Sequence, residues 1–196
     1  MRHLTALDRL VAALDAGLRA STGQVTEGVR PNPAGDTPEM PYDADGVRMV
    51  ARLVRVDHAG EVAAQGLYEG QALTARNRTL AGELREAARE EADHLAWCSQ
   101  RLDELGAEPS RLAPLWYFGS FTIGAVAGAL DDRWSLGFVV ETERQVQRHL
   151  DDHLDRIPLD DGRTRAILGR MREDEARHAT NAYQAGGQEL PGPIRR

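Results

Sequence analysis

The sequence predicts an all-α protein built as a helical bundle, and three observations support this prediction. Ala, Leu, Arg and Glu are abundant while aromatic residues make up only 5% of the chain, a composition that favours helices over sheets. Apolar residues recur at spacings of three, four and seven along successive stretches, which is the period of one helix face. Two of these stretches also carry a Glu and a His three residues apart on the apolar face, at Glu91 and His94 and again at Glu175 and His178.

Length, charge and cysteine content narrow the class of protein. A chain of 196 residues with 41% hydrophobic and 28% charged residues is expected to form one domain with its own core. The net charge of −7 argues against nucleic-acid binding, which needs a basic face. The single cysteine, Cys98, excludes an internal disulfide and fits a reducing cytosol. It lies on an apolar stripe, so we expect a buried small hydrophobe rather than a nucleophile.

The N-terminal part is predicted to be an amphipathic helix followed by a linker. In residues 1–21 the apolar side chains step by three and four, without the apolar run of a signal peptide. This helix is expected to dock onto the bundle or, alternatively, to lie on a membrane surface. Residues 22–46 lose the pattern and are rich in Pro and Gly, which predicts a flexible linker. The bundle is expected over residues 47–187, with a C-terminal tail over residues 188–196.

The first two bundle helices are predicted over about residues 45–75 and 79–105. Glu61 lies in the middle of the apolar stripe of the first helix, a costly position for a carboxylate unless it is paired or bound to metal. Three glycines also lie in this helix: Gly60, Gly66 and Gly70. Because glycine is a poor helix former, they indicate close approach by a neighbouring helix or, alternatively, by a ligand. The second helix carries Glu91 and His94.

The stretch 112–130 contains no charged residue. After Pro114 it would be about 24 Å long as a helix, short of the roughly 30 Å of a bilayer core. Gly124 and Gly128 form a small-x-x-x-small pair suited to helix contact. Two interpretations stay open: a buried bundle helix, or an apolar face that contacts a membrane or admits an apolar substrate. The aromatic candidates for substrate or membrane contact are Trp116, Tyr117, Phe118 and Phe121.

Two further helices are predicted over about residues 131–157 and 160–185. Glu143 lies on the apolar stripe of the former, whereas Glu141 is out of phase and is expected in solvent. The latter carries the second Glu-x-x-His motif.

The chain therefore contains two copies of one helix pair, each with a lone Glu on an apolar face followed by a Glu-x-x-His motif at nearly equal spacing. Four carboxylates and two imidazoles are the ligands of two iron or manganese ions in some four-helix bundles. The absence of thiolate ligands argues against a structural zinc or iron–sulfur site. The alternative is that the acids are surface groups of charged helices. The six candidate metal ligands are Glu61, Glu91, His94, Glu143, Glu175 and His178.

Other polar residues are candidates for supporting these ligands. A ligating His usually donates its second ring proton to a carboxylate, and Asp57 and Asp174 are the candidate carboxylates. His58 either supports the site or packs as an ordinary polar residue. We expect His149 near a pocket and His153 in solvent.

Several motifs occur in a fixed order over about residues 45–193: Arg55-Val56-Asp57-His58-Ala59-Gly60-Glu61, Tyr68-Glu69-Gly70-Gln71, Glu90-Glu91-Ala92-Asp93-His94-Leu95, Pro114-Leu115-Trp116, Gly137-Phe138-Val139 and Glu173-Asp174-Glu175-Ala176-Arg177-His178. In these motifs the chain resembles the demethoxyubiquinone hydroxylase family of ubiquinone biosynthesis. The resemblance implies a ferritin-like four-helix bundle with additional N-terminal and apolar helices. It also implies two iron ions per chain, held by the same six ligands.

By this resemblance the expected function is a di-iron monooxygenase that hydroxylates the ring of a demethoxyubiquinol with dioxygen, late in ubiquinone biosynthesis. No dinucleotide-binding motif is present, so electrons are expected from outside or through the quinone. The alternative is a ferritin-like iron-binding or peroxide-scavenging protein with the same ligands.

The polyprenyl tail of the substrate implies peripheral contact with the cytoplasmic side of the bacterial inner membrane. Other ubiquinone-biosynthesis proteins and a second copy of the chain are further expected partners. Family members usually continue past the Pro-x-Pro segment with an amphipathic stretch, whereas this sequence ends at Arg196. The stretch 112–130 is therefore the main expected membrane contact.

Overall fold

The computed structural model describes residues 30–192 and, before them, residues 8, 11, 15 and 19. The described residues form helices and no strands, which confirms the all-α prediction. The amphipathic helix predicted over residues 1–21 lies mostly outside the described residues, although its four described positions are helical and exposed. The elements are α2 (Ala44–Thr74), α3 (Arg78–Glu104), α4 (Ala113–Leu130), α5 (Asp132–Arg156) and α6 (Gly162–Gln184).

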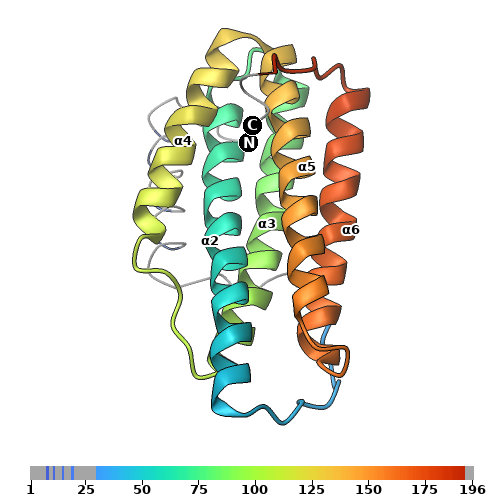
Figure 1. Cartoon of the computed structure of the whole chain (residues 1–196). Coiled ribbons are helices and arrows are strands. Elements are labelled where there is room, and N and C mark those ends of the chain that lie inside the picture. The colour runs from blue at the N-terminus through green and yellow to red at the C-terminus, as the bar shows by residue number, and fades with distance from the viewer. Residues whose placement is uncertain (1–7, 9–10, 12–14, 16–18, 20–29, 193–196) are drawn as a thin grey trace.

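Helices α2, α3, α5 and α6 form a four-helix bundle, and α4 lies against the outer side of α2 (Figure 1). The closest neighbours within the bundle are α2 with α3 and α5 with α6. These are the two helix pairs that the sequence repeats, so each copy folds as an antiparallel hairpin and the two hairpins pack together.

Each bundle helix begins at a side chain that caps its free amide groups. Asp43 accepts a hydrogen bond from the amide of Gly46 at 2.7 Å. In the same way Asn77 caps α3, Asp131 caps α5 and Asp161 caps α6. The helix starts are therefore fixed by short-range signals in the sequence.

Helices α2 and α4 approach backbone to backbone, and glycines make this possible. A Cβ atom at Gly70 would lie 2.1 Å from the carbonyl oxygen of Phe121, and one at Gly124 would lie 2.2 Å from that of Leu67. Gly66 and Gly128 meet the facing helix in the same manner. The predicted close approach is confirmed at Gly66 and Gly70, where the approaching group is a neighbouring helix, but it is wrong for Gly60, whose added Cβ would meet nothing within 4 Å.

The two faces of α4 differ. Its inner face is buried against α2, and its outer face exposes Leu115, Trp116, Ile123, Val126 and Leu130. Among the described helices, α4 alone is long and apolar enough to cross a membrane by length and composition. Its 18 residues correspond to about 27 Å. One face of α4 is therefore buried in the protein, as the first interpretation predicted, and the other is apolar and exposed.

The aromatic residues of α4 do not all face outward as expected. Trp116 is 41% exposed, but Tyr117 is fully buried. Phe118 and Phe121 are partly buried and pack against Tyr117. The expectation of an outward-facing Tyr117 is wrong, because the glycine contact with α2 turns this side of α4 inward.

The described part of the predicted flexible linker is residues 30–46. The linker ends earlier than predicted, because α2 begins at Ala44, and residues 30–43 lack helix but pack on the bundle. Ala34 is 1% exposed and joins the core. Arg30 forms ion pairs with Asp93 and Asp174, and Glu39 pairs with the buried Arg101. Because this segment is rich in Pro and Gly, its backbone is irregular, and ion pairs hold it against the bundle.

Two apolar clusters fill the bundle on either side of its middle. One surrounds Trp97 and includes the buried Cys98, as expected. The other surrounds Leu84. On each bundle helix, the one or two candidate ligands lie between residues of one cluster and residues of the other. The polar site is therefore enclosed at both ends by packed hydrocarbon.

Candidate metal centre

All six candidate ligands meet in the middle of the bundle, and each is at most 7% exposed. Helix α2 contributes Glu61 and α5 contributes Glu143. Helices α3 and α6 contribute one Glu-x-x-His motif each. Spacing of three places the Glu and the His of a motif on one face, one turn apart.

The ligands form two overlapping groups that share two carboxylates. Glu61, Glu91, His94 and Glu175 make up one group, and Glu91, Glu143, Glu175 and His178 make up the other; within each, the ligand atoms lie within 4.8 Å of one another. The Nδ1 atom of His94 lies 2.9 Å from Glu91 Oε2 and 3.1 Å from Glu175 Oε1. The Nδ1 atom of His178 lies 3.2 Å from Glu91 Oε1 and 3.3 Å from Glu175 Oε2. Each shared carboxylate thus directs one oxygen to each group, which is the geometry of a bridging ligand.

Electrostatics in the centre favour positive charge. Burial raises the pKa of Glu61 and that of Glu143 well above the usual range. Burial also opposes charge on His178, but the nearby Glu175 and Glu91 outweigh it and raise the pKa of His178 to about 11. The pKa of His94 is raised for the same reason. Against the effect of burial, neighbouring groups lower the pKa of Glu91 and that of Glu175, so these two carboxylates stay charged. Divalent cations would neutralise this negative charge.

Unpaired polar atoms fit such cations. Oε1 of Glu91, both carboxylate oxygens of Glu175 and Nδ1 of His178 are buried and lack a well-formed hydrogen bond to any described residue. Native proteins rarely leave such atoms unpaired. The donor set of carboxylate oxygens and imidazole nitrogens suits iron or manganese.

The outward ring nitrogens of both histidines have carboxylate partners. Nε2 of His94 lies 3.2 Å from Oδ2 of Asp174, the pairing expected for Asp174. Nε2 of His178 lies 3.0 Å from Oε2 of Glu90. Both imidazoles can thereby keep their protons on Nε2 and present Nδ1 to the shared carboxylates.

Asp57 and His153 lie elsewhere than expected, whereas His58 follows one of its two predicted interpretations. Asp57 contacts neither candidate ligand histidine; it lies 2.8 Å from His153 and 3.5 Å from His149. His153 is 3% exposed, so its predicted solvent exposure is wrong. His58 is hydrogen-bonded through Nε2 to Ser99 at 3.0 Å, as ordinary polar packing.

Tyr68 belongs to the centre but was not predicted as a site residue. It is 1% exposed, and its hydroxyl donates a hydrogen bond to Oε1 of Glu143. Its position two turns after Glu61 on the same face of α2 was the available signal. Glu141, by contrast, is not among the clustered ligands and contacts Gln145 and Arg148. Its side chain is only 12% exposed, so its predicted position in solvent is wrong.

A cavity of about 360 Å³ opens beside the second group of ligands. His178 and Tyr68 line its inner end, and Glu90 and Arg177 also contribute. Its apolar wall is formed by Leu80, Leu84, Leu136 and Val139. The cavity offers an apolar surface with a few polar groups next to the candidate ligands, as small-molecule sites do.

A four-helix bundle with two Glu-x-x-His motifs and two further glutamates is the architecture of the ferritin-like dinuclear metal proteins. Residues 48–194 match the protein-family model described as ubiquinone biosynthesis protein COQ7. The chain belongs to this COQ7 family.

Individual relatives are similar over nearly the whole chain. The chain is 56% identical to the 3-demethoxyubiquinol 3-hydroxylase of Ralstonia pickettii, over 96% of this chain and 92% of the relative. It is 55% identical to the protein of that name from Xanthomonas oryzae, over 96% of this chain and 86% of the relative. It is 53% identical to the protein of that name from Nitrosococcus oceani, over 99% of this chain and 91% of the relative.

Proposed function

We propose that this protein is a 3-demethoxyubiquinol 3-hydroxylase, an oxidoreductase of ubiquinone biosynthesis that hydroxylates the ring of a demethoxyubiquinol with dioxygen. The observation that carries the proposal is the pair of ligand groups sharing Glu91 and Glu175, next to an open cavity. The names of the relatives support the choice of substrate.

Six residues would hold the metal: Glu61, Glu91, His94, Glu143, Glu175 and His178. Two iron ions bound there would supply the electrons that activate dioxygen, with one oxygen atom passing to the ring and the other leaving as water. Around them, the apolar cluster near Trp97 closes one end of the centre, and residues of the Leu84 cluster line the open cavity at the other.

The residues around the ligands have distinct tasks. Asp174 and Glu90 orient the two imidazoles by holding the Nε2 protons. The hydroxyl of Tyr68 holds Glu143 in one orientation. Both effects fix the ligand geometry before any substrate binds.

The cavity beside His178 is the proposed site of the quinol ring. Its leucine and valine side chains would pack on the ring, while Glu90, Arg177 and Asn181 lie within reach of ring oxygens. The polyprenyl tail strongly prefers a membrane, at about 0.8 kcal/mol per buried CH₂. The exposed apolar face of α4 is the proposed contact with the cytoplasmic side of the inner membrane.

The direct test supplies the iron-loaded protein with a short-tailed demethoxyubiquinol, a chemical reductant and ¹⁸O₂. The expected product is the hydroxylated quinol carrying one ¹⁸O, identified by mass spectrometry, with Glu143→Ala inactive as the control. Iron oxidation and peroxide consumption without a hydroxylated quinol would instead identify the iron-binding or peroxide-scavenging alternative and overturn the proposal.

A further inference from the structure

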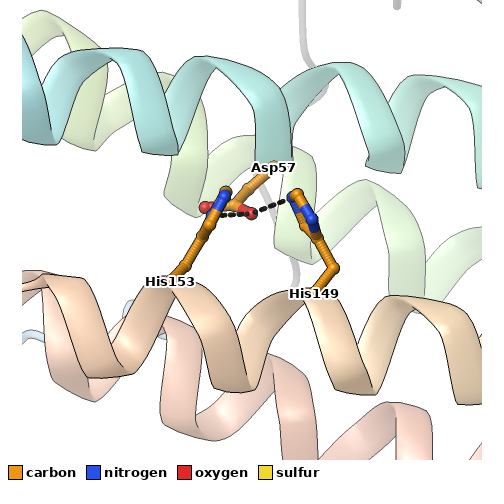
Figure 2. Close-up of side chains that lie close together, drawn as sticks. All are labelled: Asp57, His149 and His153. Carbon is orange, nitrogen blue, oxygen red and sulfur yellow. Dashed lines mark ion pairs between the residues drawn. The ribbon is translucent and has the colours of Figure 1, made fainter.

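A second group of metal-binding side chains lies outside the six candidate ligands. Asp57 of α2 points toward His149 and His153 of α5, and the ligand atoms of the three lie within 4.8 Å of one another (Figure 2). The two histidines are four residues apart, so they stand one turn apart on the same face of α5. Their ring centroids are 3.9 Å apart.

The distances suit a bound first-row metal. Oδ1 of Asp57 lies 2.8 Å from Nδ1 of His153 and 3.5 Å from Nε2 of His149. In a tetrahedral zinc site with bonds of roughly 2.0–2.1 Å, neighbouring ligand atoms are separated by about 3.3 Å. The observed separations lie on either side of this value. Two imidazoles and one carboxylate form a ligand set that zinc and ferrous iron both accept.

Buried polar atoms without a well-formed hydrogen bond point to a missing ligand at this place, although Nδ1 of His153 and Oδ1 of Asp57 form an ion pair. Both carboxylate oxygens of Asp57 and Nδ1 of His153 lack a well-formed hydrogen bond within the described part of the chain. The two side chains are at least nine-tenths buried. Burial also raises the pKa of Asp57, so the carboxylate is poorly stabilised in its charged form. A cation between the three groups would satisfy all of these atoms.

Solvent can reach the group from one side. The side chain of His149 is 42% exposed, in contrast to Asp57 and His153. A metal could therefore enter at His149 and keep a water molecule in the remaining coordination position. The group shares no residue with the six candidate ligands, although Asp57 lies one turn before Glu61 on α2.

We infer that Asp57, His149 and His153 form a separate, solvent-accessible binding site for a divalent transition metal such as zinc, which links α2 to α5. These two helices are also joined by the hydrogen bond of Tyr68 to Glu143 and by that of Gln71 to Ser135. A metal at this position is a cross-link between the two helix hairpins.

The test uses the full-length, iron-loaded protein and zinc as the probe. After equilibration with Zn²⁺ and removal of the excess, metals per chain are measured by mass spectrometry. The wild type is expected to take up one zinc per chain without losing iron. The double variant His149→Gln/His153→Gln should lose that zinc and keep its iron. The matched control Arg148→Gln/Asp152→Asn changes two exposed residues of the same helix and should bind zinc as the wild type does.

A single variant, His149→Gln, guards against misfolding of the double variant because His149 is partly exposed. Its zinc affinity should fall by at least about tenfold, since a ligand matters more than the supporting residues whose loss costs 10–100-fold. The inference is overturned if the wild type takes up no zinc, or if His149→Gln binds it equally well. Zinc uptake that occurs only as iron is lost would also overturn it, because the zinc would then occupy the six-ligand centre.

Discussion

Glu90 and His178 are hydrogen-bonded between α3 and α6, with 3.0 Å between Oε2 and Nε2. Glu90 directly precedes Glu91, a candidate ligand of the other motif. Asp174 precedes Glu175 and stands in the same relation to His94. Each Glu-x-x-His motif thus carries, one residue earlier, the carboxylate that orients the histidine of the other motif.

Replacing Glu90 with Gln should weaken metal binding without unfolding the protein. Gln can still contact His178, but it removes the negative charge that holds the Nε2 proton, and loss of such partners costs about 10–100-fold in affinity. The measurement is iron affinity by competition with a chelator. Glu86→Gln is the matched control, because Glu86 lies one turn earlier on α3, is exposed and pairs with Arg89. Equal affinities in the two variants would show that Glu90 does not support the centre.

Gly70→Ala should destabilise the protein, because the new methyl group would lie 2.1 Å from the backbone oxygen of Phe121. Relief requires α2 and α4 to separate, at a cost of about 1–3 kcal/mol or more. Gly60→Ala is the control on the same helix: nothing lies within 4 Å of its added Cβ, so it should stabilise by up to about 1 kcal/mol. Urea unfolding gives the free energy of unfolding of both variants. Equal changes in the two would contradict the close contact between α2 and α4.

His58→Gln should alter the pH dependence of stability. Burial lowers the pKa of His58 from 6.5 to about 4. As the pH falls through this window, the unfolded chain takes up a proton that the folded protein refuses, so the wild type loses stability. Relative to His58→Gln, the loss should total about 3 kcal/mol between pH 6.5 and pH 4. Urea unfolding at several pH values tests this, and parallel curves for the two proteins would contradict it.

The outer face of α4 should bind lipid bilayers. Replacing Leu115, Ile123 and Val126 with Ser removes apolar side chains that are more than half exposed, and should lower vesicle binding by about tenfold or more. Leu159→Ser, at an even more exposed apolar residue after α5, serves as the control and should bind as the wild type does. Sedimentation with vesicles provides the measurement. Unchanged binding by the triple variant would exclude this face.

Helical phase sufficed to select the six residues that meet in the bundle, because a carboxylate on an apolar stripe can only point inward. Helical phase could not predict which face of α4 is buried. This helix is apolar on every side, so its sequence does not show which side faces the bundle. The glycine contact with α2 sets that orientation and buries Tyr117.

The partners of Asp57 also escaped prediction. Phase places Asp57 on the inner face of α2, but the residue that faces it depends on how α2 and α5 are aligned along their lengths. The structure aligns Asp57 with His153 rather than with a candidate ligand. Arg30 is a similar case: it lies in an irregular segment without any period, and only the folded chain brings it to Asp93 and Asp174.

The crossed pairing of His94 with Asp174 and of His178 with Glu90 has a consequence for symmetry. Each ligand group takes three residues from one hairpin and one bridging Glu from the other. Two identical hairpins related by a twofold axis would reproduce this arrangement, since the two crossed contacts recur with the partners exchanged. A single hairpin would leave both groups incomplete. The centre is therefore one that a homodimer of half-length chains could have built before the two halves were fused into one chain.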